Sequence, residues 1–119
     1  MLIIATAFLI GCKPPQTFNN NTYTSQDLKG TWQDDSGATI VITVLDRKAF
    51  VTSIVDYDGE VFNVLASGPE DGLFHWQAYV PSSDTSFDVW IDSVDEGSAQ
   101  SHWSNSNDAS GTEGLTRVD

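Results

Sequence analysis

Gly30-Thr31-Trp32 opens the first run of alternating apolar residues in this chain, and Leu115-Thr116-Arg117-Val118 lies at the chain's other end. Between these stretches, turn signals rich in Gly, Asp and Pro recur about every 8–12 residues, the spacing of an all-β meander. Asp58-Gly59 is the strongest signal, because glycine tolerates the positive φ of a tight hairpin. The spacing predicts an all-β fold, a small antiparallel up-and-down β-barrel of about eight strands whose first and last strands meet.

The alternation of apolar and polar residues predicts which side chains face the barrel interior. Successive side chains of a strand point to opposite faces, so residues two apart share a face. The predicted inward-facing residues are Ile40, Ile42, Val44, Phe74, Trp76, Ala78, Val80, Phe87, Val89 and Ile91, with Trp32, Phe62, Val64, Trp103 and Leu115. Because this set is bulky for a small barrel, we expect side chains to fill the interior rather than to line a large cavity.

The chain of 119 residues is long enough for one domain, and it is strongly acidic. It contains 17 acidic and 5 basic residues, which gives a net charge of −12. This balance excludes nucleic acid as a partner, because phosphate binding requires clusters of Lys and Arg. Two explanations of the acidity stay open: solubility, or attraction to a basic partner. The single cysteine, Cys12, cannot form an internal disulfide, so the fold must be stable without one.

The first segment, residues 1–11, is uncharged and almost wholly apolar. It is too short to span a bilayer, which takes about 20 residues of helix, and it fits the apolar core of a signal peptide. It leads into Leu9-Ile10-Gly11-Cys12, which resembles the bacterial lipobox. The resemblance implies cleavage before Cys12 and acylation of its thiol and new amino terminus, so that acyl chains anchor the protein in a membrane.

In enterobacterial lipoproteins, a residue other than Asp after the cysteine implies the outer membrane, and Lys13 occupies that position here. The resemblance therefore implies a lipid-anchored protein of the bacterial cell envelope, in the outer membrane and facing the periplasm. We interpret residues 12–27 as the lipidated cysteine and a polar linker, because Pro and Asn interrupt a segment without apolar periodicity. Phe18 and Tyr23 could still dock on the barrel, to which we assign residues 28–119.

The two ends of the predicted barrel resemble those of the lipocalin-like, or calycin, barrels. Those proteins carry Gly-x-Trp on the first strand and an Arg on the last strand, stacked over that Trp at the closed end. The matching residues here are Gly30, Trp32 and Arg117. A planar guanidinium over an indole gains cation–π energy. The resemblance therefore implies that these residues close one end of the barrel in a structural role.

Two groups of similar barrels suggest different functions. The avidin group also opens with a Gly-Thr-Trp strand and places several Trp around biotin. This chain contains 4 Trp, but its sequence does not let us place the polar ligand set, and fold analogy alone does not establish a ligand. Small periplasmic inhibitors of lysozymes or proteases are barrels of this size, and some are lipid-anchored. They often carry a Cys pair that is absent here, although a basic lysozyme would suit the acidic charge.

Outward-facing residues of neighbouring strands form a candidate interaction face. The tight turn at Asp95-Glu96-Gly97 is expected to bring His102 near Trp90 on the adjacent strand. An exposed Trp among polar groups suits a contact surface, because Trp and Tyr dominate binding hot spots. The alternative is a Trp half-covered by the linker or by a loop. The candidate face consists of His75, Tyr79, Asp88, Trp90, Asp92 and His102.

Catalytic and metal sites have weak support in the sequence. His75, Asp92 and His102 offer ligand types that zinc prefers, but no spacing motif accompanies them. The stretch 56–60 matches only half of a calcium loop, so we interpret it as a hairpin turn with solvated acids. Ser82-Ser83-Asp84 has neither an elbow motif nor a positioned histidine, which makes it a turn. We therefore predict no metal site, no cofactor and no catalytic residue.

Taken together, these features predict a non-catalytic binding module, anchored to a membrane through the lipid on Cys12. It would use the candidate face or a shallow barrel mouth, and its partner would be a basic protein or a small apolar ligand. The alternative is an inhibitor of an envelope-directed hydrolase, a lysozyme or a protease, that blocks a basic active-site cleft.

Overall fold

The computed structural model describes residues 15–19 and 22–119. The predicted signal peptide 1–11, its cleavage motif Leu9-Ile10-Gly11 and the predicted lipidation site Cys12 lie outside the described residues, and they stay predictions. Within the described ranges, no helix combines the length and the apolarity that crossing a bilayer requires.

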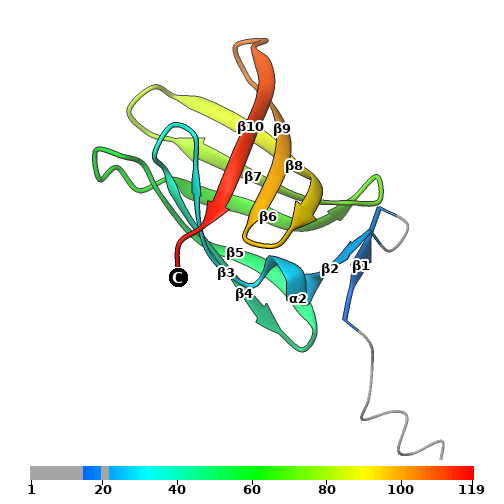
Figure 1. The fold of residues 1–119 in the computed structure, drawn as a ribbon. Coiled ribbons are helices and arrows are strands. Elements are labelled where there is room, and N and C mark those ends of the chain that lie inside the picture. The colour runs from blue at the N-terminus through cyan, green and yellow to red at the C-terminus, as the bar shows by residue number, and fades with distance from the viewer. Residues whose placement is uncertain (1–14, 20–21) are drawn as a thin grey trace, which may run out of the picture.

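Eight antiparallel strands form one sheet that curves into a nearly closed barrel (Figure 1). Neighbours in the sheet are neighbours in sequence, except where the first barrel strand pairs with the last, with Arg117 opposite Trp32. The strands are β3 (Gly30–Asp34), β4 (Thr39–Leu45), β5 (Lys48–Val55), β6 (Asn63–Glu70), β7 (Leu73–Val80), β8 (Thr85–Asp95), β9 (Ser98–Asn105) and β10 (Ser110–Arg117). The predicted all-β barrel with adjoining ends is confirmed.

The two ends of the barrel differ in which loops they carry. We call the end with loops 35–38, 56–62, 81–84 and 106–109 the mouth. The other end carries the short turns 46–47, 71–72 and 96–97, and we call it the closed end. In Figure 1 the loops of the mouth lie at the upper left, and the C-terminus lies toward the closed end.

The seam between β5 and β6 completes the barrel. Near the mouth, Val55 pairs with Val61, and the Phe62 amide donates a hydrogen bond to the Ile54 carbonyl at 2.9 Å. Farther along the seam, the Val51 amide donates to the Ser67 hydroxyl at 3.2 Å, so a side chain replaces the partner strand's carbonyl. The seam is therefore joined by backbone pairing at the mouth and by a side-chain bond toward the closed end.

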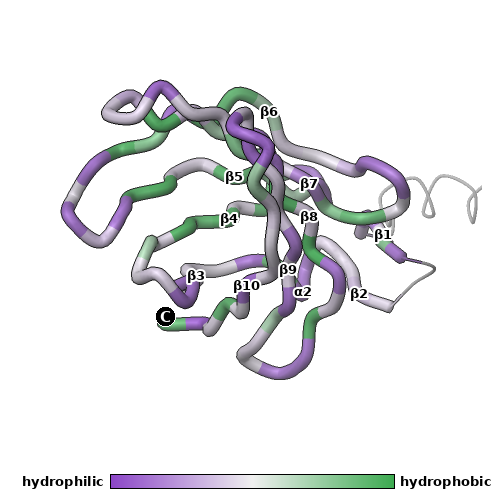
Figure 2. Tube along the Cα trace, turned by 90° about the horizontal axis from the view of Figure 1, so that it is seen from above, coloured by the Kyte–Doolittle hydropathy of each residue, from purple (hydrophilic) through white to green (hydrophobic). Residues whose placement is uncertain are grey.

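Apolar side chains from the predicted inward-facing set form the core. Trp32, Phe74 and Ile91 are almost completely buried, and Ile40, Ile42, Trp76 and Ala78 pack with them. Figure 2 shows hydrophobic and hydrophilic residues following one another in short runs along the chain. Toward the closed end of this core, Phe74 contacts Trp76 with ring centroids 5.9 Å apart.

A short N-terminal unit caps the closed end. It consists of β1 (Thr17–Phe18), β2 (Tyr23–Thr24) and the one-turn helix α2 (Ser25–Leu28). Phe18, Tyr23 and Leu28 are each only 1% exposed, and Phe18 stacks on Tyr23 with ring centroids 5.2 Å apart. The docking of Phe18 and Tyr23, which the sequence left open, is therefore seen in the structure, while the boundary between the linker 12–27 and the barrel stays a prediction.

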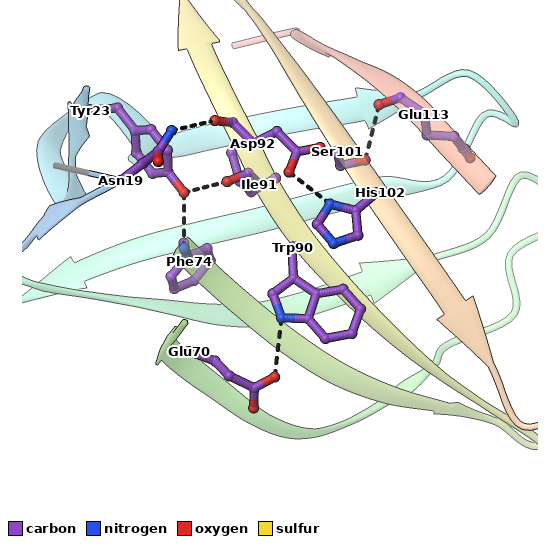
Figure 3. A network of polar contacts seen from close by, with 10 residues as sticks. All are labelled: Asn19, Tyr23, Glu70, Phe74, Trp90, Ile91, Asp92, Ser101, His102 and Glu113. Atoms are coloured by element: carbon purple, nitrogen blue, oxygen red, sulfur yellow. Dashed lines mark hydrogen bonds and ion pairs between the residues drawn. The ribbon is translucent and has the colours of Figure 1, made fainter. Parts of the chain in front are cut away.

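Hydrogen bonds fasten this N-terminal unit to the barrel. The Tyr23 hydroxyl donates to the Ile91 carbonyl and accepts from the Phe74 amide at 2.9 Å, so it joins β8 to β7 (Figure 3). Burial raises the pKa of Tyr23 to about 12. At the start of the unit, Gln16 accepts from the Ala49 amide at 3.1 Å and donates its own amide to the Arg47 carbonyl. The chain therefore enters the fold at the closed end.

The interior is filled at the closed end and hollow at the mouth. The expectation of a filled interior is correct for the closed end and wrong for the mouth, where a cavity of about 340 Å³ lies. The reason is the size of particular inward-facing residues. Ser101 and Gly111 stand opposite large neighbours, and a side chain at Gly111 would meet the Trp103 indole at 3.1 Å. Small residues at these positions leave part of the barrel open.

Candidate functional site

The cavity at the mouth lies on the inner faces of β8, β9 and β10. Apolar side chains dominate its walls, and Phe87 and Trp103 contact one another with ring centroids 5.7 Å apart. Strand pairing explains this placement, because Val89 pairs with Trp103 and Phe87 pairs with Asn105. The loop between β3 and β4 supplies one wall. The lining residues are Ser36, Phe87, Val89, Ser101, Trp103, Asn105 and Glu113.

Glu113 is the ionisable residue of this lining. Its Oε2 atom is inaccessible to solvent and is the one buried side-chain oxygen or nitrogen of the described residues that has no hydrogen-bond partner. The nearby Ser101 hydroxyl does not satisfy it, since that hydroxyl donates to the Glu113 backbone carbonyl at 3.0 Å (Figure 3). A buried, unpartnered polar atom is costly, so a group from a ligand would be favoured there.

The surroundings of Glu113 oppose its ionisation. Desolvation by burial raises its pKa to about 7, and the carboxylates of Asp34 and Asp35 add to the shift. Hydrogen bonds fix both of these acids: Asp34 accepts from the Ala38 amide of the loop at 2.9 Å, and Asp35 accepts from the Gly114 amide of β10 at 2.8 Å. The cavity therefore contains a carboxyl group that changes charge near neutral pH.

Glu113 is absent from the site residues predicted from the sequence, although the signal for it was present. On the last strand, Leu115 was predicted to face inward, and a residue two positions earlier shares its face. Glu113 stands at that position. A charged residue in an inward-facing register is unusual, because burying an unpaired charge is costly. The alternation of side chains along this strand therefore indicated that Glu113 faces the interior.

The outer face of the barrel carries the predicted aromatic cluster. Trp90 pairs across the strands with His102, and the two rings stack with an interplanar angle of 8° and centroids 4.9 Å apart. His75 contacts the Trp90 ring at the same centroid separation, from the neighbouring strand. The predicted proximity of Trp90 and His102 is confirmed, while their role in binding stays a prediction.

Carboxylates surround this cluster, and they pair with it. His75 bonds to Asp88 at 2.8 Å, His102 bonds to Asp92 at 2.7 Å, and the Trp90 indole donates to Glu70 at 3.1 Å. His75 is only 8% exposed despite its place on the outer face, because these neighbours cover it. Neither histidine forms a hydrogen bond to a hydroxyl group within the described part of the chain. The polar groups of this cluster therefore hydrogen-bond mainly to one another.

Tyr79 lies apart from the other predicted face residues. It pairs with Ser86 near the mouth, while His75 pairs with Trp90 farther along the same two strands. Its hydroxyl donates to the Asp84 carboxylate at 2.7 Å, which raises the pKa of Tyr79. The structure thus brings together five of the six predicted face residues and leaves Tyr79 in a separate turn contact.

The residues predicted to close the barrel meet as the resemblance implies. The Arg117 guanidinium lies over the Trp32 ring, 4.4 Å from the ring centroid. It also donates hydrogen bonds to the backbone carbonyls of Asp27 and Lys29, which lie just before β3. Gly30 is tightly packed there, because a Cβ on it would collide with the Arg117 side chain. The three residues hold the first and the last barrel strand, β3 and β10, together at the closed end.

The acidic hairpin 56–60 brings the ligand atoms of Asp56, Asp58 and Glu60 within 4.8 Å of one another. Each carboxylate already accepts local hydrogen bonds. Asp56 accepts from the Tyr57 amide, Asp58 accepts from the Glu60 amide, and Glu60 accepts from both the amide and the hydroxyl of Ser82. These bonds explain the geometry as a fixed turn, in line with its interpretation as a hairpin.

Comparison with known proteins supports the fold. No protein-family model matches the chain, and no curated protein matches it in sequence. Among solved structures, the complex of bradavidin2 with biotin is similar, with a TM-score of 0.57 and 8% sequence identity. The match covers 76% of this chain and 96% of that one. At this identity the likeness concerns the fold of the barrel alone.

Proposed function

We propose that this chain is a non-catalytic binding module that takes a small, largely apolar ligand into the cavity at the barrel mouth. The observation that carries the proposal is the cavity itself: about 340 Å³, walled by Phe87, Val89 and Trp103. Ligand pockets are typically concave and apolar with a few polar groups that fix orientation. Here the polar residues of the lining are Ser36, Ser101, Asn105 and Glu113.

The likeness to the bradavidin2 complex supports this proposal. That barrel is similar to this one over most of its length, and it was solved with biotin. A shared fold does not imply a shared ligand, so we include biotin only as one of several probes in the binding test. The ligand class has to be argued from the residues of this cavity.

We further propose that the module is anchored in the bacterial envelope through a lipid on Cys12, at the outer membrane and facing the periplasm. The support is the lipobox-like stretch Leu9-Ile10-Gly11-Cys12 at the end of an apolar segment. Mass spectrometry of the protein from bacterial membranes tests this. Cleavage before Cys12 and a mass gain from acyl chains are expected, and an intact leader with an unmodified thiol would contradict the proposal.

A titration of the soluble barrel with biotin and with neutral aromatic and aliphatic probes tests the cavity. We expect binding to quench or shift Trp103 fluorescence. The matched variants are Val89→Phe, which fills the cavity, and Val61→Phe, which adds the same side chain at an exposed position. Val89→Phe should weaken binding by about tenfold or more, because steric exclusion removes a buried contact. Equal binding by both variants would refute the cavity as the site.

The inhibitor alternative would act through the outer face around Trp90. It is supported by the net charge of −12 and by the carboxylates at Asp88 and Asp92. The measurement is salt-sensitive binding to a basic lysozyme, compared between the native protein and Trp90→Ala. Tight binding that is lost with Trp90→Ala and kept with Val89→Phe would favour inhibition over ligand carriage.

A further inference from the structure

Among the described residues, all basic side chains lie at one end of the barrel. Lys29 lies just before β3, Arg47 and Lys48 lie at the β4–β5 turn, and Arg117 ends β10, so all four belong to the closed end. The mouth carries carboxylates on all of its loops and no basic residue among the described positions. Its acids are Asp34, Asp35, Asp56, Asp58, Glu60, Asp84, Asp108 and Glu113.

This distribution sets the electrical potential at the cavity. Charges of one sign around a concave site concentrate molecules of the opposite sign and accelerate their entry. The cavity lies inside the acidic mouth, and none of its described lining residues is basic. A cationic molecule is therefore attracted to the cavity, and an anionic molecule is repelled from it.

The cavity also offers two local features that suit a cation. The Glu113 carboxyl has a buried oxygen without a partner. The Phe87 and Trp103 rings contact one another beside it, and aromatic faces attract ammonium groups. Charge, an unpaired acceptor and aromatic walls thus occur together in one apolar space.

We propose that the ligand of this cavity is an apolar amine, whose ammonium group pairs with the Glu113 carboxylate while its hydrocarbon body packs against Phe87, Val89 and Trp103. This inference rests on the proposed function of the cavity and specifies its ligand class. An acid of the same shape would meet the carboxylates of Glu113, Asp34 and Asp35. A neutral molecule would bury apolar surface but would leave the ionised carboxylate without a counter-charge.

The proposal has a defined pH dependence. The groups that face Glu113 from the end of β3 and the following loop are the acids Asp34 and Asp35. Its neighbours in the cavity lining from β8 and β9 include the uncharged Val89, Ser101 and Trp103. The amine binds the ionised carboxylate, and Glu113 has a pKa of about 7. Alkylamines stay protonated to about pH 10, so amine affinity should rise with pH through neutrality and then level off.

The test compares phenylbutylamine with phenylbutanol, which has the same body and no charge, by calorimetric titration. At about pH 8 we expect the amine to bind at least about tenfold more tightly than the alcohol, as a charge-assisted contact implies. At about pH 5.5 this preference should largely disappear, because Glu113 is then protonated. Glu113→Gln should abolish the preference for the amine over the alcohol at both pH values.

The control variant is Glu96→Gln, which makes the same change of net charge at an exposed turn of the closed end. It should keep the preference for the amine. If the alcohol binds as tightly as the amine and Val89→Phe still weakens it, the cavity is a binding site and the amine inference is wrong. If neither probe binds, both the cavity function and the amine inference fail. Undiminished amine preference in Glu113→Gln would assign the preference to another group and overturn the inference.

Discussion

At Gly30 the chain has a φ of +138°, a conformation that residues with a side chain rarely adopt. The position is also crowded, since an added Cβ would overlap Nη1 of Arg117. Two separate constraints therefore require glycine in the Gly-x-Trp stretch. One is the backbone angle, and the other is the close approach of the guanidinium that covers Trp32.

Replacing this glycine should reveal both constraints. We expect Gly30→Ala to lower the free energy of unfolding by about 1–3 kcal/mol from backbone strain, with a further loss from the displaced Arg117. Gly59→Ala is the control, because Gly59 has a φ of +91° and open space around it, so only the backbone cost applies. Urea unfolding of both variants measures the difference. Equal destabilisation would contradict the role of the Arg117 contact.

The N-terminal unit of β1, β2 and α2 seals the closed end of the barrel. Its Phe18 ring packs against Phe74 of β7 with ring centroids 5.7 Å apart, and its Tyr23 hydroxyl bonds to backbone groups of β7 and β8. Removal of the residues before Ser25 would therefore expose the Phe74 side chain and would leave the Phe74 amide and the Ile91 carbonyl without the Tyr23 hydroxyl. The unit belongs to the stability of the barrel.

Tyr23→Phe tests the hydrogen bonds of the N-terminal unit without removing its packing. The substitution leaves the buried Phe74 amide and the Ile91 carbonyl without the Tyr23 hydroxyl, which should cost about 1–3 kcal/mol of unfolding free energy. Tyr57→Phe removes the same hydroxyl from a residue that is 76% exposed and should change little. A Tyr23→Phe variant as stable as the native protein would contradict the structural role of these bonds.

Much of the barrel could be predicted from sequence because its signals are local. Turns such as Asp58-Gly59 and the two-residue period define the strands, and the Trp32–Arg117 pair follows from a known pattern of barrel ends. For the N-terminal unit the sequence left only the docking of Phe18 and Tyr23 open and did not indicate the strand pair β1–β2, since both residues stand among polar residues without a period. Their burial depends on a space that exists only after the barrel forms. The cavity was missed for a similar reason, because residue size and register combine across strands at Ser101 and Gly111.

Across the whole molecule, the buried carboxyl of Glu113 links stability to pH. Its pKa rises from 4.5, the ordinary value for a glutamate side chain, to about 7 in the fold. Between these values the folded protein holds a proton that the unfolded chain releases. The Glu113 contribution to unfolding free energy therefore falls as pH rises from about 4.5 to 7 and is constant above that range.

Thermal unfolding across this pH range tests the linkage in the ligand-free protein. Relative to Glu113→Gln, the native protein should lose stability steadily between about pH 5 and 7.5, because ionisation of the buried group becomes unfavourable. Glu96→Gln serves as the control and should follow the native curve. A constant difference between the native protein and Glu113→Gln at all pH values would contradict an elevated pKa at this position.

The point where the chain enters the fold determines how an anchored barrel would stand. Gln16 is bonded to the β4–β5 turn at the closed end, and its Cα lies four Cα–Cα steps along the chain from that of Cys12. An extended chain spans about 3.5 Å per residue, so the proposed acyl anchor would be held within about 14 Å of the closed end. With so short a tether the barrel would rest on its closed end beside the lipid headgroups. The mouth would open toward the aqueous side, where a ligand arrives without crossing the bilayer.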